Sequence, residues 1–282
     1  MKLVTFSHKA GHSHAGVLEG DQVACLVEAG LATSVMEIIA GGTPALERIR
    51  AGLAGAPRYA LADVRLEAPI RPSKVLCSGI NYRGHADENP NAKMPTEPFF
   101  FAKLPTSVVG PEEGVVKPPQ TEQMDYEVEF AAVIGARLHK AAEADILPAI
   151  FGYTLLNDIS ARDVQFKDNQ ITLGKNFAGF APIGPCILTA DAMPHPDNVR
   201  LMTRLNGRTL QDGTTADWLF SLPRLIAFLS QYIPLEPGDI VTTGTPAGVG
   251  IFQKPPVFMQ AGDVVEIEAE GIGILRTPIV AG

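Results

Sequence analysis

The stretch from Met124 to Gly135 constrains the fold more than any other part of the chain. Its first half alternates apolar and acidic side chains, the period-two pattern of a half-buried β-strand. Glu127 and Glu129 therefore project from the same face, roughly 7 Å apart along the backbone. Such a pair is typical of the solvated face of an antiparallel strand, or of a metal site, because neighbouring carboxylates repel unless a cation or proton lies between them. Residues 131–134 are apolar on both faces, which indicates burial and favours the metal site.

Composition limits the class of protein and its partners. The chain has 282 residues, 46% hydrophobic and 19% charged, which is enough to bury a sizeable core in one large domain or two unequal ones. A formal charge of −8 argues against nucleic acid or an anionic membrane as a partner. No apolar run reaches the length of a membrane span, and the first residues lack a signal-peptide core. Cys25, Cys77 and Cys186 form no Cys-x-x-Cys pair, so we expect a protein of the reducing cytoplasm.

Residues 1–70 have the pattern of a small N-terminal α/β domain. Strands are predicted at 3–6, 15–18, 22–26 and 63–70, and helices at 34–40 and 43–54 on either side of Gly41 and Gly42. The segment Arg71-Pro72-Ser73 marks the boundary with a larger domain over 71–282.

Three histidines cluster in this N-terminal part: His8, His12 and His14 flank Gly11. Grouped imidazoles suggest a metal site. Their expected position in a polar hairpin loop favours solvated side chains instead.

A second pair of polar residues follows the buried strand expected at 74–80. If 82–88 forms one or two helical turns, His85 and Glu88 are i,i+3 neighbours and can hydrogen-bond. A carboxylate on one imidazole nitrogen raises the basicity of the other, as in a general base. The alternative is a solvated ion pair at a helix end. The proline-rich segment 89–98 suits a loop, or a lid that closes over substrate.

An apolar run from Phe151 ends on Asn157 and Asp158, which places Asp158 at a strand end. We expect a helix at 142–150 before it. Three hard carboxylate oxygens from Glu127, Glu129 and Asp158, with no Cys or His alongside, suit Mg²⁺, Mn²⁺ or Ca²⁺ better than zinc.

The C-terminal third is rich in predicted strands, with one helix at 221–232. A glycine-rich loop over 244–250 is not a P-loop, because no Gly-Lys-Ser/Thr closes it. Its amides and Thr245 can receive a carboxylate or an oxyanion. A hairpin is predicted over 261–277, and we interpret Glu266, Glu268 and Glu270 on its first strand as a solvated face.

Five ordered blocks between Lys74 and the C-terminus together resemble the fumarylacetoacetate hydrolase family. They are Asn81-Tyr-x-x-His85-x-x-Glu88, Asp125-Tyr-Glu-Val-Glu129, Asn157-Asp-Ile-Ser-Ala-Arg-Asp163-Val-Gln165, Gly174-Lys175 and Thr243-Gly-Thr-Pro-x-Gly-Val-Gly250. The resemblance implies an α+β fold, with a mixed β-roll catalytic domain behind the small N-terminal domain, and a homodimer. It implies a divalent cation, usually Mg²⁺, on Glu127, Glu129 and Asp158, and a water-activating dyad of His85 and Glu88. Substrate contacts are implied for Arg162, Gln165, Lys175 and Thr245.

The chemistry that the resemblance implies is metal-dependent hydrolysis of an acylpyruvate-type β-diketo acid to pyruvate and a carboxylic acid. Lys175 adds a positive charge beside the enolate that departs. The same enolate arises in oxaloacetate decarboxylation and in isomerisation of a 2-hydroxy-dienedioate in aromatic catabolism, so these remain alternatives. Asn169 stands where some of these hydrolases have a tyrosine, and the segment before Gly174 is short. A narrow apolar mouth formed by 99–101 favours a small substrate tail.

Two other classes of protein fit the sequence less well. A metal-dependent nuclease should have a basic surface, and this chain is acidic. A binding module without activity should have lost a metal ligand or the dyad, yet all five residues are present. No Gly-x-Ser-x-Gly motif supports a serine hydrolase.

Overall fold

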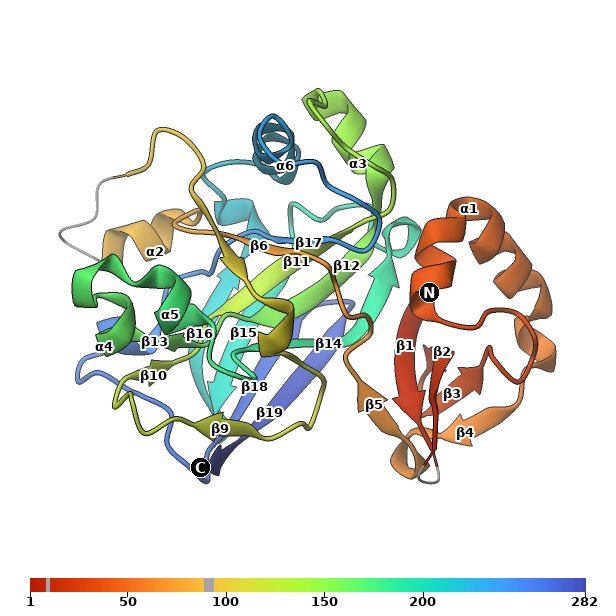
Figure 1. Ribbon diagram of the computed structural model, residues 1–282, viewed down its shortest axis with the longest axis horizontal. Coiled ribbons are helices and arrows are strands. Elements are labelled where there is room, and N and C mark those ends of the chain that lie inside the picture. The colour runs from red at the N-terminus through yellow and green to blue at the C-terminus, as the bar shows by residue number, and fades with distance from the viewer. Residues whose placement is uncertain (9–10, 89–93) are drawn as a thin grey trace.

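One mixed sheet of twelve strands runs through both parts of the chain in the computed structural model, which describes residues 1–8, 11–88 and 94–282 (Figure 1). Its main strands, in spatial order, are β4 (Arg58–Ala60), β3 (Gln22–Cys25), β2 (Ser13–Glu19), β1 (Lys2–Ser7), β14 (Ala181–Thr189), β12 (Ile150–Asn157), β11 (Val128–Ile134), β17 (Ile240–Thr242), β6 (Val75–Ser78) and β7 (Phe100–Lys103). Two more strands pair outside this order, β5 (Arg65–Glu67) with β1 and β8 (Val108–Val109) with β14.

A second sheet of five strands packs against the centre of the first. Its spatial order is β16 (Arg208–Thr214), β15 (Arg200–Leu205), β18 (Val264–Ala269), β19 (Gly273–Ala281) and β9 (Val115–Lys117). The predicted hairpin over 261–277 is confirmed as β18 and β19. Glu266 and Glu268 lie on the more exposed face of β18, and Glu270 just beyond it is exposed, as expected for a solvated face. The first two also pair with Arg204 on the neighbouring strand β15.

Strand β11 lies between two hydrophobic cores. The half-buried pattern predicted for the first half of 124–135 is therefore wrong, whereas the burial expected for 131–134 is confirmed. Phe130 and Ala132 face the core shared with the five-stranded sheet, whereas Ala131 and Val133 face the core shared with helix α1. Every residue from 124 to 134 is buried. The stretch is also two strands, because β10 (Met124–Asp125) leaves the large sheet and pairs with β13 (Ser160–Ala161).

The N-terminal part consists of β1 to β5 and helix α1 (Val35–Gly52). The predicted break between two helices is confirmed at Gly42, whose φ of 54° and ψ of −143° interrupt α1. Only 65–67 of the stretch predicted as a strand at 63–70 forms a paired β-strand, and η2 (Leu61–Asp63) occupies its start. Strand β1 pairs with β14, which joins this part to the central sheet. The division into domains at residue 70 stays a prediction.

Helices cover the edges of the sheets. Helix α6 (Leu222–Ser230) begins at Ser221, whose hydroxyl accepts a hydrogen bond from the Arg224 amide, and it packs beside α3 (Ile146–Ala149). The single helix predicted at 142–150 is wrong. The structure has a 3₁₀ turn, η4 (Glu143–Asp145), followed by the single turn α3, and Ile150 already belongs to β12. None of the described helices is long and apolar enough to cross a membrane.

Three short helices, α2 (Arg83–Glu88), α4 (Arg162–Gln165) and α5 (Ile171–Lys175), gather on the side of the molecule away from the N-terminal part (Figure 1). The remaining 3₁₀ turns are η1 (Leu53–Gly55), η3 (Pro105–Ser107), η5 (Lys167–Asn169), η6 (Ala190–Ala192), η7 (Thr215–Asp217) and η8 (Gly250–Phe252). The described structure is thus a mixture of helices and strands, in agreement with the α+β class.

Candidate active site

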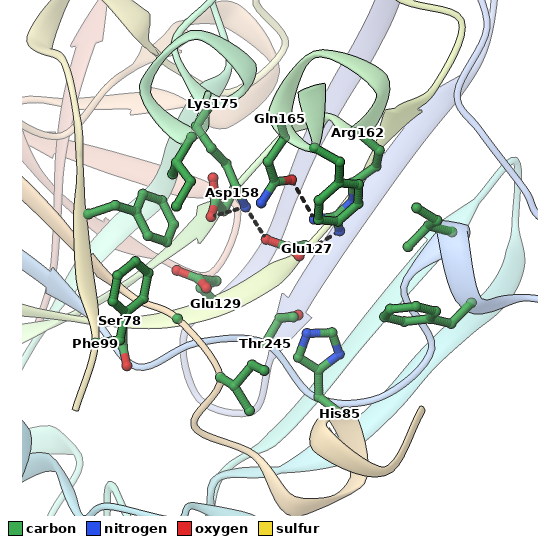
Figure 2. A pocket seen from close by; sticks show the side chains of 17 residues that line it. Ser78, His85, Phe99, Glu127, Glu129, Asp158, Arg162, Gln165, Lys175 and Thr245 are labelled. Atoms are coloured by element: carbon green, nitrogen blue, oxygen red, sulfur yellow. Dashed lines mark hydrogen bonds and ion pairs between the residues drawn. The ribbon is translucent and has the colours of Figure 1, made fainter. Parts of the chain in front are cut away.

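A cavity of about 240 Å³ lies where the three short helices meet the ends of β6, β11 and β12 (Figure 2). Eight of the nine predicted site residues line it: His85, Glu127, Glu129, Asp158, Arg162, Gln165, Lys175 and Thr245. The ninth, Glu88, lies behind His85. The structure therefore brings together residues that are up to 160 positions apart in the sequence, and their individual roles stay predictions.

Glu127 lies in the bend between β10 and β11. Its amide donates to Asn157 Oδ1 over 3.0 Å, and its carbonyl accepts from the Asp158 amide over 2.9 Å. These two hydrogen bonds tie the bend to the end of β12 and so set the position of Glu127 beside Asp158.

Two buried cations hold the Glu127 carboxylate. Arg162 Nη2 is 2.6 Å from Oε1, and Lys175 Nζ is 2.6 Å from Oε2. Burial disfavours the ionised carboxylate, but the charges of Arg162 and Lys175 outweigh it and hold the pKa of Glu127 well below its usual range. The carboxylate therefore stays ionised without a metal ion.

Glu129 has a different environment. Its side chain is buried, and Oε2 accepts no hydrogen bond from the described residues. Burial and the nearby charges of Asp158 and Glu127 raise the pKa of Glu129 well above its usual value. A buried acceptor without a donor, beside other carboxylates, fits a cation-binding site.

Asp158 lies between two lysines. Its Oδ2 is 2.7 Å from Lys175 Nζ, and its Oδ1 is 2.6 Å from Lys103 Nζ. The sequence analysis missed Lys103, whose fully buried ammonium also donates to the carbonyls of Ile159 and Phe180. A lysine directly after the apolar run 99–102 was the available signal.

Cys77 corrects the expectation that no cysteine lies beside the carboxylates. The Cys77 Sγ atom and one carboxylate oxygen from each of Glu129 and Asp158 all lie within 4.8 Å of one another. Burial, followed by the charges of Asp158 and Glu129, raises the pKa of the Cys77 thiol well above its usual value. A neutral thiol is a poor ligand. Glu127 is not part of this group, and its two oxygens bind Arg162 and Lys175. The set of three carboxylates therefore stays a prediction, and its oxygen donors would fit a hard cation such as Mg²⁺ or Mn²⁺.

Arg162 is engaged by the protein on three sides. Its Nε is 2.8 Å from Asp125 Oδ2, its Nη2 binds Glu127, and its Nη1 is 3.1 Å from Gln165 Oε1. This geometry makes Arg162 a positioning residue for Glu127 as well as a predicted substrate contact. It also fixes the Gln165 amide so that Nε2, a donor, is left for a substrate oxygen.

The glycine-rich loop is tied to the same network. Asp125 accepts from the amides of Gly250 (2.7 Å) and Ile251 (3.1 Å). A Cβ at residue 250 would lie 1.9 Å from the Val257 carbonyl oxygen, so glycine is required there. Thr245 is held by Gln211, whose Nε2 donates to its hydroxyl over 2.8 Å. Asp125 and Gln211 are further residues to which the sequence analysis assigned no role.

His85 and Glu88 form the predicted hydrogen-bonded pair on α2, with His85 Nδ1 and Glu88 Oε2 3.0 Å apart. The other Glu88 oxygen accepts from the Gly248 amide over 2.6 Å, so the pair is anchored to the glycine-rich loop. His85 lines the cavity, and its Nε2 is left for substrate. The predicted lid at 89–98 lies partly outside the described residues, which resume at Met94.

Aromatic side chains form the apolar wall of the cavity. Phe99 and Phe101 line it, and the Phe101 ring lies 5.0 Å from Lys175 Nζ. Asn169, which replaces a tyrosine of some hydrolases, is exposed, and Phe166 and Ile171 line the cavity nearby.

Much of the chain matches a known protein family. Residues 74–280 match the family model described as fumarylacetoacetate (FAA) hydrolase C-terminal. The chain therefore belongs to the fumarylacetoacetate hydrolase family.

Relatives in this family have several activities in their names. The mitochondrial oxaloacetate tautomerase FAHD2A of Bos taurus is 38% identical over 290 residues, which cover 99% of this chain and 92% of that protein. Fumarylacetoacetate hydrolase from Exiguobacterium antarcticum is 36% identical with a TM-score of 0.87, and each chain is fully covered. A 2-hydroxyhepta-2,4-diene-1,7-dioate isomerase from Mycobacterium marinum is 32% identical with a TM-score of 0.78, over 100% of this chain and 98% of that one.

The names of these relatives are those of enzymes, but they leave several finer predictions open. The bovine protein is named mitochondrial, so a cytoplasmic location stays a prediction for this chain. The homodimer also stays a prediction.

The contrast between Glu127 and Glu129 gives a testable prediction. Glu127→Gln removes the charge that pairs with Arg162 and Lys175, so it should lower the free energy of unfolding of the metal-free protein by roughly 3 kcal/mol. Burial and the neighbouring carboxylates disfavour the ionised form of Glu129, and its Oε2 accepts no hydrogen bond from the described residues, so Glu129→Gln should leave this stability unchanged or raise it. Both variants should lose the rise in Tm caused by Mg²⁺. Urea and thermal unfolding with and without Mg²⁺ measure these changes, and equal destabilisation by both substitutions would contradict the assignment.

Proposed function

We propose that this protein catalyses keto–enol tautomerisation of a short 2-oxo acid with a carboxylate at C4, and that oxaloacetate is its substrate. The observation that carries the proposal is the placement of a histidine held by a carboxylate, His85, and a buried ammonium, Lys175, in one small cavity. The alignment with a bovine oxaloacetate tautomerase over 99% of this chain supports it.

Lys175 supplies a fixed positive charge. Burial opposes its ionisation, but Asp158 and Glu127 outweigh burial and raise the pKa of Lys175 above its usual value. It therefore stabilises negative charge on the 2-oxo oxygen as the enolate forms, and it does not act as a base.

His85 carries the proton. Tautomerisation moves one proton between C3 and the oxygen on C2, consumes no water and breaks no C–C bond. Imidazole is the side chain that takes up and releases protons near neutral pH. The Glu88 carboxylate fixes the ring through Nδ1, which leaves Nε2 to exchange the proton at C3.

Glu127, Glu129 and Asp158 are the residues that would hold a divalent cation, with Mg²⁺ as the first choice. When bound, such a cation would neutralise negative charge on the substrate's carboxylate and enolate oxygens. Gln165 Nε2 and the Thr245 hydroxyl are placed to orient those oxygens.

The size of the cavity agrees with a small substrate. Pockets for drug-sized ligands usually have about 300–1,000 Å³, and this cavity has about 240 Å³. A four-carbon acid fits that volume. The phenylalanine rings leave little room for a long tail.

Hydrolysis of an acylpyruvate is the second candidate function, favoured by the same His85–Glu88 pair. A histidine oriented by a carboxylate can deprotonate a water molecule as well as a carbon acid. Water would then attack the distal carbonyl, and the bond between C3 and C4 would break to give pyruvate enolate and a carboxylic acid. Oxaloacetate decarboxylation and dienedioate isomerisation pass through the same enolate and remain alternatives.

A panel of substrates with Mg²⁺ separates these activities. With oxaloacetate, we expect the enol absorbance to reach equilibrium faster with the enzyme than without it, while pyruvate does not accumulate. Acetylpyruvate and fumarylpyruvate test hydrolysis, and a 2-hydroxy-dienedioate tests isomerisation. Pyruvate formation from oxaloacetate would assign decarboxylation, pyruvate and acetate from acetylpyruvate would assign hydrolysis, and no effect on the oxaloacetate enol would refute the tautomerase proposal.

The role of His85 gives a further prediction. His85→Ala should lower catalysed tautomerisation by roughly a hundredfold or more, the scale of general-base loss, because it removes the imidazole proposed to exchange the proton at C3. The rise in Tm with Mg²⁺ should remain, since the three carboxylates are intact. Exposed His139 provides the matched control, and His139→Ala should change neither property. Loss of both activity and the Mg²⁺ effect in His85→Ala would show that His85 is structural or a metal ligand.

A further inference from the structure

Four neighbouring segments of the N-terminal part carry two histidines, a glutamate and a tyrosine. These segments lie on the side of the molecule away from α2, α4 and α5 (Figure 1). His8 directly follows β1, and His14 lies on β2 opposite Phe6. Glu28 follows β3, and Tyr59 lies on β4 opposite Val23. The strand pairing therefore places these side chains at one end of the sheet. The sequence analysis noticed the histidines but not Glu28.

We propose that His8, His14 and Glu28 form a Zn²⁺ site, distinct from the carboxylate site of the active-site cavity. One ligand atom from each of the three residues lies within 4.8 Å of the other two. Two imidazoles and a carboxylate are a recurrent zinc donor set, with water in the fourth position. The same donors suit Mg²⁺ poorly, because it prefers oxygen ligands.

The distances are close to those around a bound zinc ion. His8 Nε2 and Glu28 Oε1 are 3.2 Å apart. Ligands of tetrahedral zinc, at bond lengths of 2.0–2.1 Å, lie roughly 3.3 Å from each other. The ring centroids of His8 and His14 are 5.0 Å apart. A small rotation of the side chains would bring the third donor into the same tetrahedron.

Neighbouring groups orient the three ligands. The Tyr59 hydroxyl lies 2.8 Å from both oxygens of Glu28, and the His8 ring stacks on the Tyr59 ring with centroids 4.2 Å apart. Cys25 Sγ lies 3.5 Å from His14 Nδ1. Partners of this kind fix the orientation of metal ligands.

A hydrogen-bonded cluster without metal explains the arrangement less well. The hydrogen bond between His8 Nε2 and Glu28 Oε1 needs no third residue. It leaves unexplained why a ring nitrogen of His14 also lies within 4.8 Å of both partners. A shared cation accounts for all three side chains.

The site would be structural. Its ligands come from the end of β1, from β2 and from the segment after β3, so a bound ion would tie three chain segments together. Because β1 also pairs with β14 of the central sheet, the ion would stabilise the attachment of the N-terminal part. It would not enter the reaction.

Metal content and stability of the full-length protein test the proposal. After chelation and dialysis, wild-type protein in excess Mg²⁺ should bind one Zn²⁺ per chain, and its Tm should rise by several degrees. His14→Ala and Glu28→Gln should weaken Zn²⁺ binding at least about tenfold and lose that rise. His195→Ala, at an exposed histidine elsewhere, should behave as wild type. Far-UV circular dichroism and the Tm in chelator show whether each variant folds. If His14→Ala or Glu28→Gln does not fold, His8→Ala takes its place in the test.

Two controls separate this site from the active site. Glu129→Gln should still bind the Zn²⁺, because it alters only the carboxylate site. Co²⁺ bound at the proposed site should show the visible absorption of tetrahedral coordination, which His14→Ala abolishes. Equal Zn²⁺ binding by wild type, His14→Ala and Glu28→Gln, or no binding by wild type, would overturn the proposal. The tautomerase assay is independent of either outcome.

Discussion

The active-site cavity depends on charges that are buried together. Arg162 and Lys175 hold Glu127, and Lys103 and Lys175 hold Asp158, all at distances of 2.6–2.7 Å. Each charge comes from a different element: the bend before β11, the end of β12, β7, α4 and α5. An unpaired buried charge costs several kcal/mol. Moving one of these elements away from the others would leave such a charge without its partner and would lower the free energy of unfolding. The positions of the reactive side chains therefore follow from how the charges are compensated.

Local patterns in the sequence predicted the parts of the site that local geometry determines. The i,i+3 spacing of His85 and Glu88 and the strand-end position of Asp158 are properties of a few neighbouring residues. Lys103 and Gln211 are different, because their partners Asp158 and Thr245 lie 55 and 34 residues away. Only the topology of the two sheets brings them together. The resemblance to a family supplied Lys175 and Gln165, which periodicity alone did not single out.

The errors in the predicted fold have the same cause. Alternation in 124–130 correctly indicates extended backbone, but it cannot distinguish a face in water from a face covered by another layer. Phe130 and Ala131 point in opposite directions and both are fully buried, since β11 lies between the five-stranded sheet and the core around α1. The helix expected at 142–150 fails for a related reason: pairing of Ile150 with β11 takes that residue into β12. Pairing with distant strands outweighs local helix propensity.

The numbers of buried carboxylates and cations also bear on the charge of the proposed substrate. Around the cavity, the described residues Asp125, Glu127, Glu129 and Asp158 face three cations, Lys103, Arg162 and Lys175. If all seven were ionised, one negative charge would remain, and the raised pKa of Glu129 reflects that excess. A divalent cation on the carboxylates would change the sum to one positive charge. A substrate with one ionised carboxylate would then neutralise the cluster, and the proposed oxaloacetate, which has two, would leave one negative charge. A divalent cation would thus offset the charge of the proposed acid substrate, because it reverses the sign of the sum.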